Sequence, residues 1–175
     1  DAIDPSLSPV IAVSTPTSDN TSSYTFRSTE AGVIIYGGTT GCAADNFTGA
    51  VAGDNNIIFN ELPDGPYSCT INVRDNASNT SSLLSVNTFI IDTIDPIVAE
   101  ETPVTTPDNV STPSYTFSST DNGTISYGGA CGSSSSSTAT SEEDNQVTLT
   151  HTDNSTPLID KSYGTCTIRV TDAAG

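Results

Sequence analysis

Positive charge is scarce in this sequence. Lys and Arg together contribute 4 residues against 21 Asp and Glu, which gives a formal net charge of −17 at pH 7. A chain with this charge repels phosphate backbones and anionic membrane surfaces alike. We therefore expect no nucleic-acid partner and no direct membrane insertion.

Long apolar runs and a leader segment are also missing. No stretch approaches the roughly 18 apolar residues that a helix needs to cross a bilayer. Asp1 does not open a signal peptide. We expect a processed chain or an internal piece of a longer protein, with any membrane anchor located elsewhere.

Histidine is nearly absent, so the sequence offers few candidates for a general acid or base. His151 is the only histidine, it lies in a polar segment, and the first half of the chain has no counterpart. Because Ser is so abundant, some Ser, His and Asp side chains coexist by chance. The acidic residues Glu142, Glu143 and Asp144 follow a serine run and are expected to form a solvated loop. We expect a protein that is not an enzyme.

One pattern of residues occurs twice in the sequence, once in each half of the chain. The segment Ser23–Phe26 (Ser-Tyr-Thr-Phe) returns as Ser114–Phe117, and the Tyr-Gly-Gly of residues 36–38 returns at 127–129. A period of about 90 residues indicates tandem modules, which build length and favour a structural or adhesive surface protein. We expect two domains, residues 1–93 and 94–175.

Apolar and polar residues alternate within each repeat, as they do in strands with one buried face. Tyr67, Cys69, Ile71 and Val73 are one such series, and no stretch has a convincing helical period. Turn-forming Gly, Pro, Asn and Asp separate the runs. We predict an all-β fold of two β-sandwich domains. The expected strands are 10–13, 23–28, 32–36, 55–60, 67–74 and 82–91, then 97–100, 114–119, 124–127, 145–150 and 163–171.

The second repeat lacks a counterpart to the last strand of the first. After Asp75 the first repeat continues through Leu84 and Val86, whereas only Ala-Ala-Gly follows Asp172. Two explanations are open: the strand lies in the next part of a longer array, or another subunit donates it to the exposed edge. Pro9–Val13 is a candidate donor, although it also suits the first strand of its own domain. The mass of the native polypeptide would distinguish the two.

Four cysteines fall as one pair in each repeat. Their even number, their placement and the absence of a CxxC pair favour structural disulfides over zinc. We predict the pairs Cys42–Cys69 and Cys131–Cys166. Each closes a loop of about 30 residues and would contribute roughly 3.5–4 kcal/mol of stability. Disulfides imply an oxidising location, which is extracellular or at the cell surface.

Residues 73–79 (Val-Arg-Asp-Asn-Ala-Ser-Asn), 89–96 and the partial copy at 170–175 resemble the tandem bacterial immunoglobulin-like repeats of giant surface adhesins and extracellular filaments. The resemblance covers the whole chain. It implies two immunoglobulin-like β-sandwiches, each with one disulfide, of a kind that serve as stalks, spacers or binding tips.

The chain shares one feature with antibody-type immunoglobulin domains and departs from them in others. Tyr67 precedes Cys69 by two residues and resembles the tyrosine corner, whereas Tyr163 precedes Cys166 by three. The chain has no Trp, and Cys42 follows the third expected strand. We therefore do not expect the disulfide of Cys42 to link the two sheets of the sandwich, as the disulfide of antibody domains does.

Calcium is a candidate ligand, because bacterial immunoglobulin-like extenders often stiffen their linkers with it. Asp75, Asn76, Asp92 and Asp95 come from the end of one strand and the linker, with Asp4 and Asp172 in matching places. Their oxygens suit this hard cation, and we expect them to converge at the interdomain joint. Asp and Asn are also ordinary turn residues, which is the alternative.

Asn-X-Ser/Thr sequons offer glycosylation sites if the host modifies them. They occur at Asn20, Asn46, Asn76, Asn79, Asn109, Asn122 and Asn154. Because Ser and Thr are common, several sequons would arise at random.

Together these patterns predict a structural extracellular module, part of a cell-surface filament or adhesin stalk. Its expected partners are copies of itself or further immunoglobulin-like repeats. One alternative is a module that binds a glycan or cell-surface ligand, which a glycan array would test. The other is a spacer of a secreted hydrolase, which requires a catalytic domain in the same gene.

Overall fold

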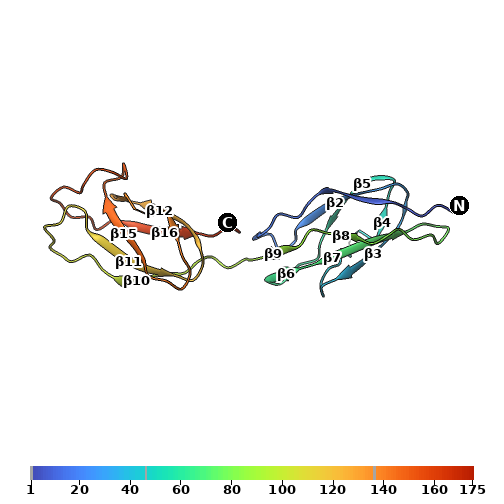
Figure 1. The fold of residues 1–175 in the computed structure, drawn as a ribbon, viewed down its shortest axis with the longest axis horizontal. Helices are drawn as coiled ribbons and strands as arrows, with labels where there is room; N and C mark the ends of the chain where they lie inside the picture. The colour runs from blue at the N-terminus through green and yellow to red at the C-terminus, as the bar shows by residue number, and fades with distance from the viewer. Residues whose placement is uncertain (1, 46, 136) are drawn as a thin grey trace. The chain divides into compact units, whose positions relative to one another are not determined.

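The computed structural model describes residues 2–45, 47–135 and 137–175. The chain divides into two compact units: unit 1 is Asp1–Ile94 with Ala174, and unit 2 is Asp95–Ala173 with Gly175. Throughout the described residues the regular structure is β-strand (Figure 1). This part of the chain accordingly has no helix long and apolar enough to cross a membrane.

The described residues of unit 1 form two main antiparallel sheets and one short strand pair. The first sheet has the order β1 (Leu7–Ile11), β2 (Ser23–Ser28), β5 (Gly53–Ile58). The second has the order β4 (Gly49–Ala50), β3 (Gly32–Gly38), β7 (Cys69–Arg74), β8 (Leu84–Ser85). The short pair is β6 (Gly65–Tyr67) with β9 (Phe89–Ile91).

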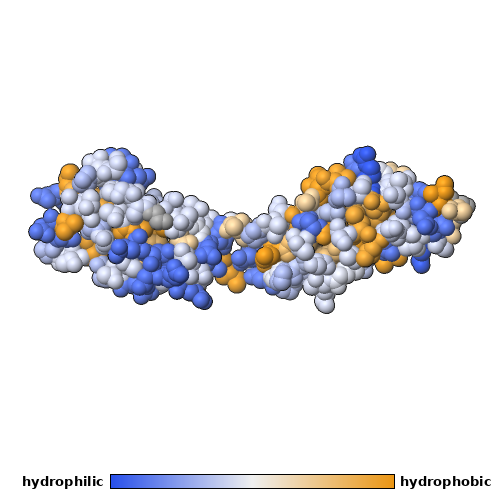
Figure 2. Space-filling model, viewed as in Figure 1, coloured by the Kyte–Doolittle hydropathy of each residue, from blue (hydrophilic) through white to orange (hydrophobic). Residues whose placement is uncertain are grey.

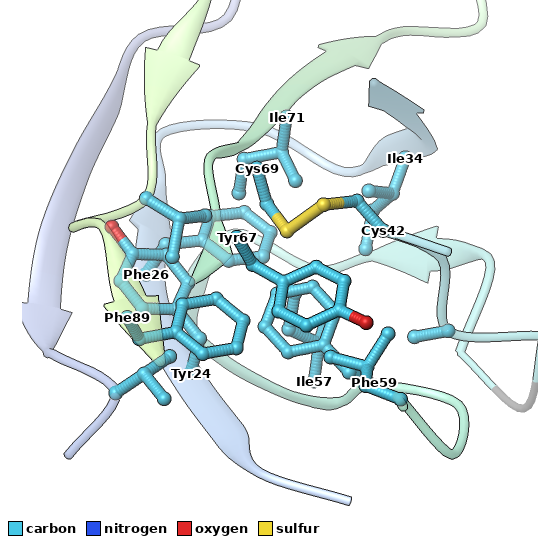
Figure 3. Close-up of a cluster of buried hydrophobic side chains, with 14 of the residues drawn as sticks. Tyr24, Phe26, Ile34, Cys42, Ile57, Phe59, Tyr67, Cys69, Ile71 and Phe89 are labelled. Atoms are coloured by element: carbon cyan, nitrogen blue, oxygen red, sulfur yellow. A yellow bond between two sulfur atoms is a disulfide. The ribbon is translucent and has the colours of Figure 1, made fainter. Parts of the chain in front are cut away.

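The core of unit 1 is built from the alternating side chains of both main sheets. Phe26 from β2 and Ile71 from β7 are fully buried and belong to one cluster, part of which Figure 3 shows. The ring of Phe89 stacks between Phe59 and Tyr67, with centroids 5.6 and 5.5 Å apart. A strand exposes every second residue to the same side, so a period of two places these side chains together.

Unit 2 repeats this arrangement with a smaller core. Its first sheet has the order β10 (Val98–Thr102), β11 (Ser114–Ser119), β15 (Asn145–Thr150), β13 (Gly132–Ser133). Its second has the order β14 (Thr138–Ala139), β12 (Gly123–Gly128), β16 (Thr167–Thr171). The buried cluster consists of Phe117, Ile125, Ala139, Val147, Leu149 and Val170.

The two units share even an irregularity of strand pairing. In unit 1 the register between β1 and β2 shifts between Pro9 and Ile11. In unit 2 the register between β10 and β11 shifts between Glu100 and Thr102, at the same point of the repeat. A bulge is a specific local feature, so its recurrence indicates that the repeated sequence folds the same way twice.

The predicted strands at 23–28, 114–119 and 145–150 agree with the structure. The predicted first strand, 10–13, lies too late, because β1 is Leu7–Ile11. The predicted strand 163–171 begins only at Thr167, since residues 164 and 165 form a turn. The predicted strand 82–91 is interrupted and contains two short strands, β8 and β9. The two-residue strands β4, β13 and β14 were not predicted, because their length gives no periodicity.

Candidate functional site

Each unit contains the disulfide predicted for it. Cys42 is bonded to Cys69, and Cys131 is bonded to Cys166. Cys69 opens β7 opposite Gly38 of β3, and Cys42 lies in the loop that follows β3. The bridge therefore ties this loop to the neighbouring strand of the same sheet, as Figure 3 shows. Two such bonds indicate a non-reducing environment.

Tyr67 and Tyr163 form hydrogen bonds to the backbone of the segments that precede Cys69 and Cys166. The Tyr67 hydroxyl donates to the carbonyl of Pro63 at 2.8 Å. The Tyr163 hydroxyl donates to the carbonyl of Ile159 at 3.1 Å and accepts the N–H of the same residue at 2.9 Å. Both contacts reach four residues upstream, in the manner of a tyrosine corner. The different spacing from Tyr163 to its cysteine thus does not prevent the contact.

A buried asparagine closes the turn before β5 and, in unit 2, the turn before β15. Asn55 is 1% exposed and bonds the backbone of Val51 and Gly53. Asn145 bonds the backbone of Thr140 and Glu143 in the same way. Sequence reasoning missed this pair, although an Asn at the same place in both repeats was a visible signal.

The expected convergence of Asp75 with Asp92 at the interdomain joint is wrong. Asp92 follows β9, whose Ile91 pairs with Gly65 of β6. Asp75 directly follows β7, and β7 continues the chain direction of β6. At about 3.3 Å per residue, Asp75 therefore lies about 30 Å from Gly65. Figure 1 shows β6 and the far end of β7 at opposite ends of unit 1. A single ion cannot bind both carboxylates.

Asp75 instead holds the turn that follows β7. Its carboxylate accepts the backbone N–H and the side-chain amide of Asn79, both at 2.8 Å. These bonds, with one from the backbone of Ala77, lower the pKa of Asp75. Asn76 is exposed beside it. Among the described residues, no group of three or more His, Cys, Asp or Glu is placed to hold a metal ion.

The predicted sequons differ in how accessible their side chains are. Asn76, Asn109, Asn122 and Asn154 are exposed. Asn20 and Asn79 are half-buried, and their Nδ2 atoms donate to Glu61 and Asp75. Asn46 lies outside the described residues. The exposed positions are therefore the ones best placed for modification.

The lone histidine lies in a loop held by its own acidic neighbour. Asp153 accepts bonds from the Thr156 hydroxyl and from the backbone of Ser155 and Thr156, which lower its pKa. The His151 ring contacts Thr152 at 3.2 Å. Glu142, Glu143 and Asp144 are exposed. Asp153 therefore serves to order the loop through these contacts.

The edge of β16 in unit 2 differs from that of β7, its counterpart in unit 1. In unit 1 its counterpart β7 lies between β3 and β8. In unit 2, β16 pairs with β12 and is the last strand of its sheet among the described residues. A pocket of about 240 Å³ lies beside it, lined by Asp95, Pro96, Val98, Ile168, Arg169, Val170, Thr171 and Gly175. Four of these eight residues have apolar side chains, and Asp95, Arg169 and Thr171 are polar, so the lining of the pocket is mixed.

Two residues near the start of β16, Cys166 and the pocket-lining Ile168, are less buried than their counterparts in unit 1. Cys69 and Ile71 are 1% and 0% exposed, whereas Cys166 and Ile168 are half-buried. The difference follows the presence of β8 in unit 1.

A second difference concerns the outward face of the sheet that contains β3. Val33 and Ile35 are 48% and 41% exposed, and Ile35 lies opposite Asn72. Leu83, beside β8, is 63% exposed. In unit 2 the places of Val33 and Ile35 are taken by polar Thr124 and Ser126. Figure 2 shows extensive apolar surface on unit 1, while the visible face of unit 2 is mostly polar.

Comparisons with protein-family models, with curated proteins and with solved structures found no match for this chain. The case for its function therefore rests on the chain's own geometry.

Proposed function

We propose that this chain is a structural module of an extracellular filament or an adhesin stalk. In this proposal two immunoglobulin-like β-sandwiches stand in series and hold a binding tip or neighbouring subunits at a distance. The module is not an enzyme and acts at the cell surface.

The observation that carries this proposal is the duplication of one stabilising framework. Each unit has the same bulge in its first strand, the same buried asparagine and a disulfide at the same place. A small domain buries a limited share of its surface, so such fastenings matter for its stability. The net charge of −17 also favours solubility and an extended arrangement of modules through like-charge repulsion.

Single-molecule stretching tests the mechanical role. The disulfides span sequence separations of 27 and 35 residues, and these segments stay locked while the bonds are intact. On reduction, the two units should lengthen on unfolding by a further ~90 Å and ~120 Å, at about 3.5 Å per residue. Unfolding without distinct force peaks, with or without reductant, would count against a load-bearing module.

The apolar outward face of unit 1 favours a second candidate, a module that binds a cell-surface ligand. Contiguous exposed apolar side chains often mark interaction sites. Replacing Val33 by Thr and Ile35 by Ser installs the residues that unit 2 carries, so folding should be retained. If the face binds a ligand, this double variant should lose binding to target cells while a glycan array shows whether sugars are involved.

A further inference from the structure

We propose that the outward face of the sheet β4–β3–β7–β8 in unit 1 is a contact surface for the same face of a second copy of this chain. The contact is symmetric, so that one patch meets itself. This inference rests on the proposed function and deepens it, because it names where neighbouring subunits meet.

Unit 1 exposes apolar side chains on this face where unit 2 exposes polar ones. Val33 and Ile35 are exposed, and Thr124 and Ser126 take their places in unit 2. Strand β3 lies between β4 and β7, so these two side chains are exposed on the face of a paired strand and not at an open edge. Leu83, beside β8, adds to the same apolar surface. Contiguous apolar surface of this kind often marks a protein interface.

The opposite sheet of unit 1, β1–β2–β5, is less suited to a contact between two copies. Two isoleucines are exposed there, and unit 2 has threonine in their places: Ile11 and Ile58 match Thr102 and Thr148. This sheet also carries a charged pair, because the side chains of Arg27 and Asp54 lie 2.7 Å apart at its surface. Its β1 pairs with β2 of its own unit, so the segment Pro9–Val13 contains a first strand of unit 1 and is not free to act as a donor.

The face around Val33 and Ile35 has no carboxylate among its described outward positions on β3 and β7. These positions are Val33, Ile35, Gly37, Thr70, Asn72 and Arg74. The carboxylate of the next residue, Asp75, is buried and bonds Asn79. Two chains of net charge −17 can therefore approach through this face without bringing acidic groups together, whereas like charge opposes other approaches. Interfaces between identical subunits are likewise apolar and depleted in charge at their centres.

The position of Arg74 also suits a symmetric contact. Three rows cross the two strands: Val33 with Arg74, Ile35 with Asn72, and Gly37 with Thr70. A two-fold axis that runs across the strands over the middle row brings Ile35 against Ile35 of the second copy and sets Arg74 over the uncharged third row. The two arginines then lie about 13 Å apart along the strands, which exceeds the Debye length of about 8 Å at physiological salt.

Sedimentation of the full 175-residue chain over a concentration series tests the proposal. We expect a monomer–dimer equilibrium. Val33→Thr with Ile35→Ser should weaken the dimer by at least about tenfold, since each lost contact counts twice in a symmetric interface. The control, Ile11→Thr with Ile58→Thr, makes the same kind of exchange on the opposite sheet and should leave the equilibrium unchanged. A chain that stays monomeric, or a dimer that both double variants affect equally, overturns the proposal.

Cross-linking examines the contact directly. Ile35→Cys should give a covalent dimer on mild oxidation, because the symmetric contact sets the two thiols against each other. Ile58→Cys, on the opposite sheet, is the matched control and should stay monomeric under the same conditions. Both variants keep the Cys42–Cys69 bond, and their melting curves show whether they are folded. Covalent dimers formed equally by both variants would contradict this location of the contact.

Added salt distinguishes this contact from one made through charge. Salt screens the repulsion between two chains of net charge −17 and should strengthen the symmetric dimer. A dimer that weakens with salt would instead pair Arg74 with a carboxylate of the second copy and overturn the face-to-face arrangement. If the chain does not dimerise, this inference fails, while the stretching experiment still decides the mechanical role separately. Loss of cell binding by the Val33 and Ile35 double variant of a monomeric chain would assign the face to a cell-surface ligand and refute the contact between copies.

Discussion

The side chain of Asn55 is bonded on both sides to the backbone of Val51. Its Oδ1 accepts the Val51 N–H at 2.8 Å, and its Nδ2 donates to the Val51 carbonyl at 2.9 Å. A third bond joins Nδ2 to the carbonyl of Gly53. Because Asn145 repeats this set with Thr140 and Glu143, the contact belongs to the framework of the repeat.

Asn55→Ala should therefore destabilise unit 1. The substitution removes three hydrogen bonds that this buried side chain makes to the backbone of the turn, which costs about 1–3 kcal/mol. Asn145→Ala should have a similar effect on unit 2. Asn56→Ala is the control, since the Asn56 side chain is exposed and accepts a hydrogen bond from the Thr25 hydroxyl at the surface. Chemical denaturation of the three variants measures the difference, and equal losses at Asn55 and Asn56 would contradict it.

Two buried tyrosines predict opposite effects for the same substitution. Tyr67→Phe removes the bond to the Pro63 carbonyl and should cost about 1 kcal/mol. The Tyr24 hydroxyl is buried and has no hydrogen-bond partner among the described residues. Tyr24→Phe removes an unsatisfied polar group and should be neutral or stabilising. Melting temperatures of the two variants, which differ from the parent by one oxygen each, decide the matter.

Much of this framework could be predicted from the sequence, because it depends on local patterns. Alternation located the strand 23–28, and pairing within each repeat located the Cys42–Cys69 bond. The role of Asn55 was missed because asparagine is common in turns and its burial depends on which strands cover it. The position of Asp75 relative to Asp92 was wrong for a related reason: local pattern does not state at which end of a unit a strand finishes.

Alkaline pH should destabilise the chain partly through Tyr36. Its hydroxyl donates to the Phe47 carbonyl at 2.6 Å. Burial, with a smaller effect of the Asp45 charge, raises the pKa of Tyr36 from 10.0 to about 12. Folding thus favours the protonated hydroxyl, and this stabilisation is fully present below about pH 10 and is lost as pH rises through about 12.

The free energy of unfolding, measured from pH 9 to 12, should fall over the upper part of this range. Tyr36→Phe should make the decline shallower because the substituted ring has no proton to lose. A decline of unchanged slope in the variant would show that other groups account for the alkaline loss.

Replacing both Cys42 and Cys69 by alanine should lower the stability of unit 1 by about 3–4 kcal/mol. The loss arises mainly because the unfolded chain gains freedom when the loop is opened. Alanine avoids placing a hydroxyl group among buried side chains, since Cys42 and Cys69 are 7% and 1% exposed. Denaturant unfolding with reductant present provides the check: reductant should destabilise unit 1 of the parent chain and leave unit 1 of the double variant unchanged.

The second glycine of the repeated Tyr-Gly-Gly is expected to tolerate no side chain. Gly38 and Gly129 have φ values of 103° and 75°, which favour glycine. A Cβ at Gly38 would meet the Ser68 carbonyl oxygen, and one at Gly129 would meet that of Thr165. Gly38→Ala and Gly129→Ala should each cost about 1–3 kcal/mol through backbone strain, and more if the neighbouring strand must move.

Gly49→Ala provides the matched control for these two variants. Gly49 does not have a positive φ, and a Cβ built there meets nothing within 4 Å. Its substitution should be neutral or slightly stabilising, because alanine restricts the unfolded chain. If Gly38→Ala unfolds at the same denaturant concentration as Gly49→Ala, the close approach of the Tyr-Gly-Gly turn to the strand bearing the second cysteine does not constrain the fold.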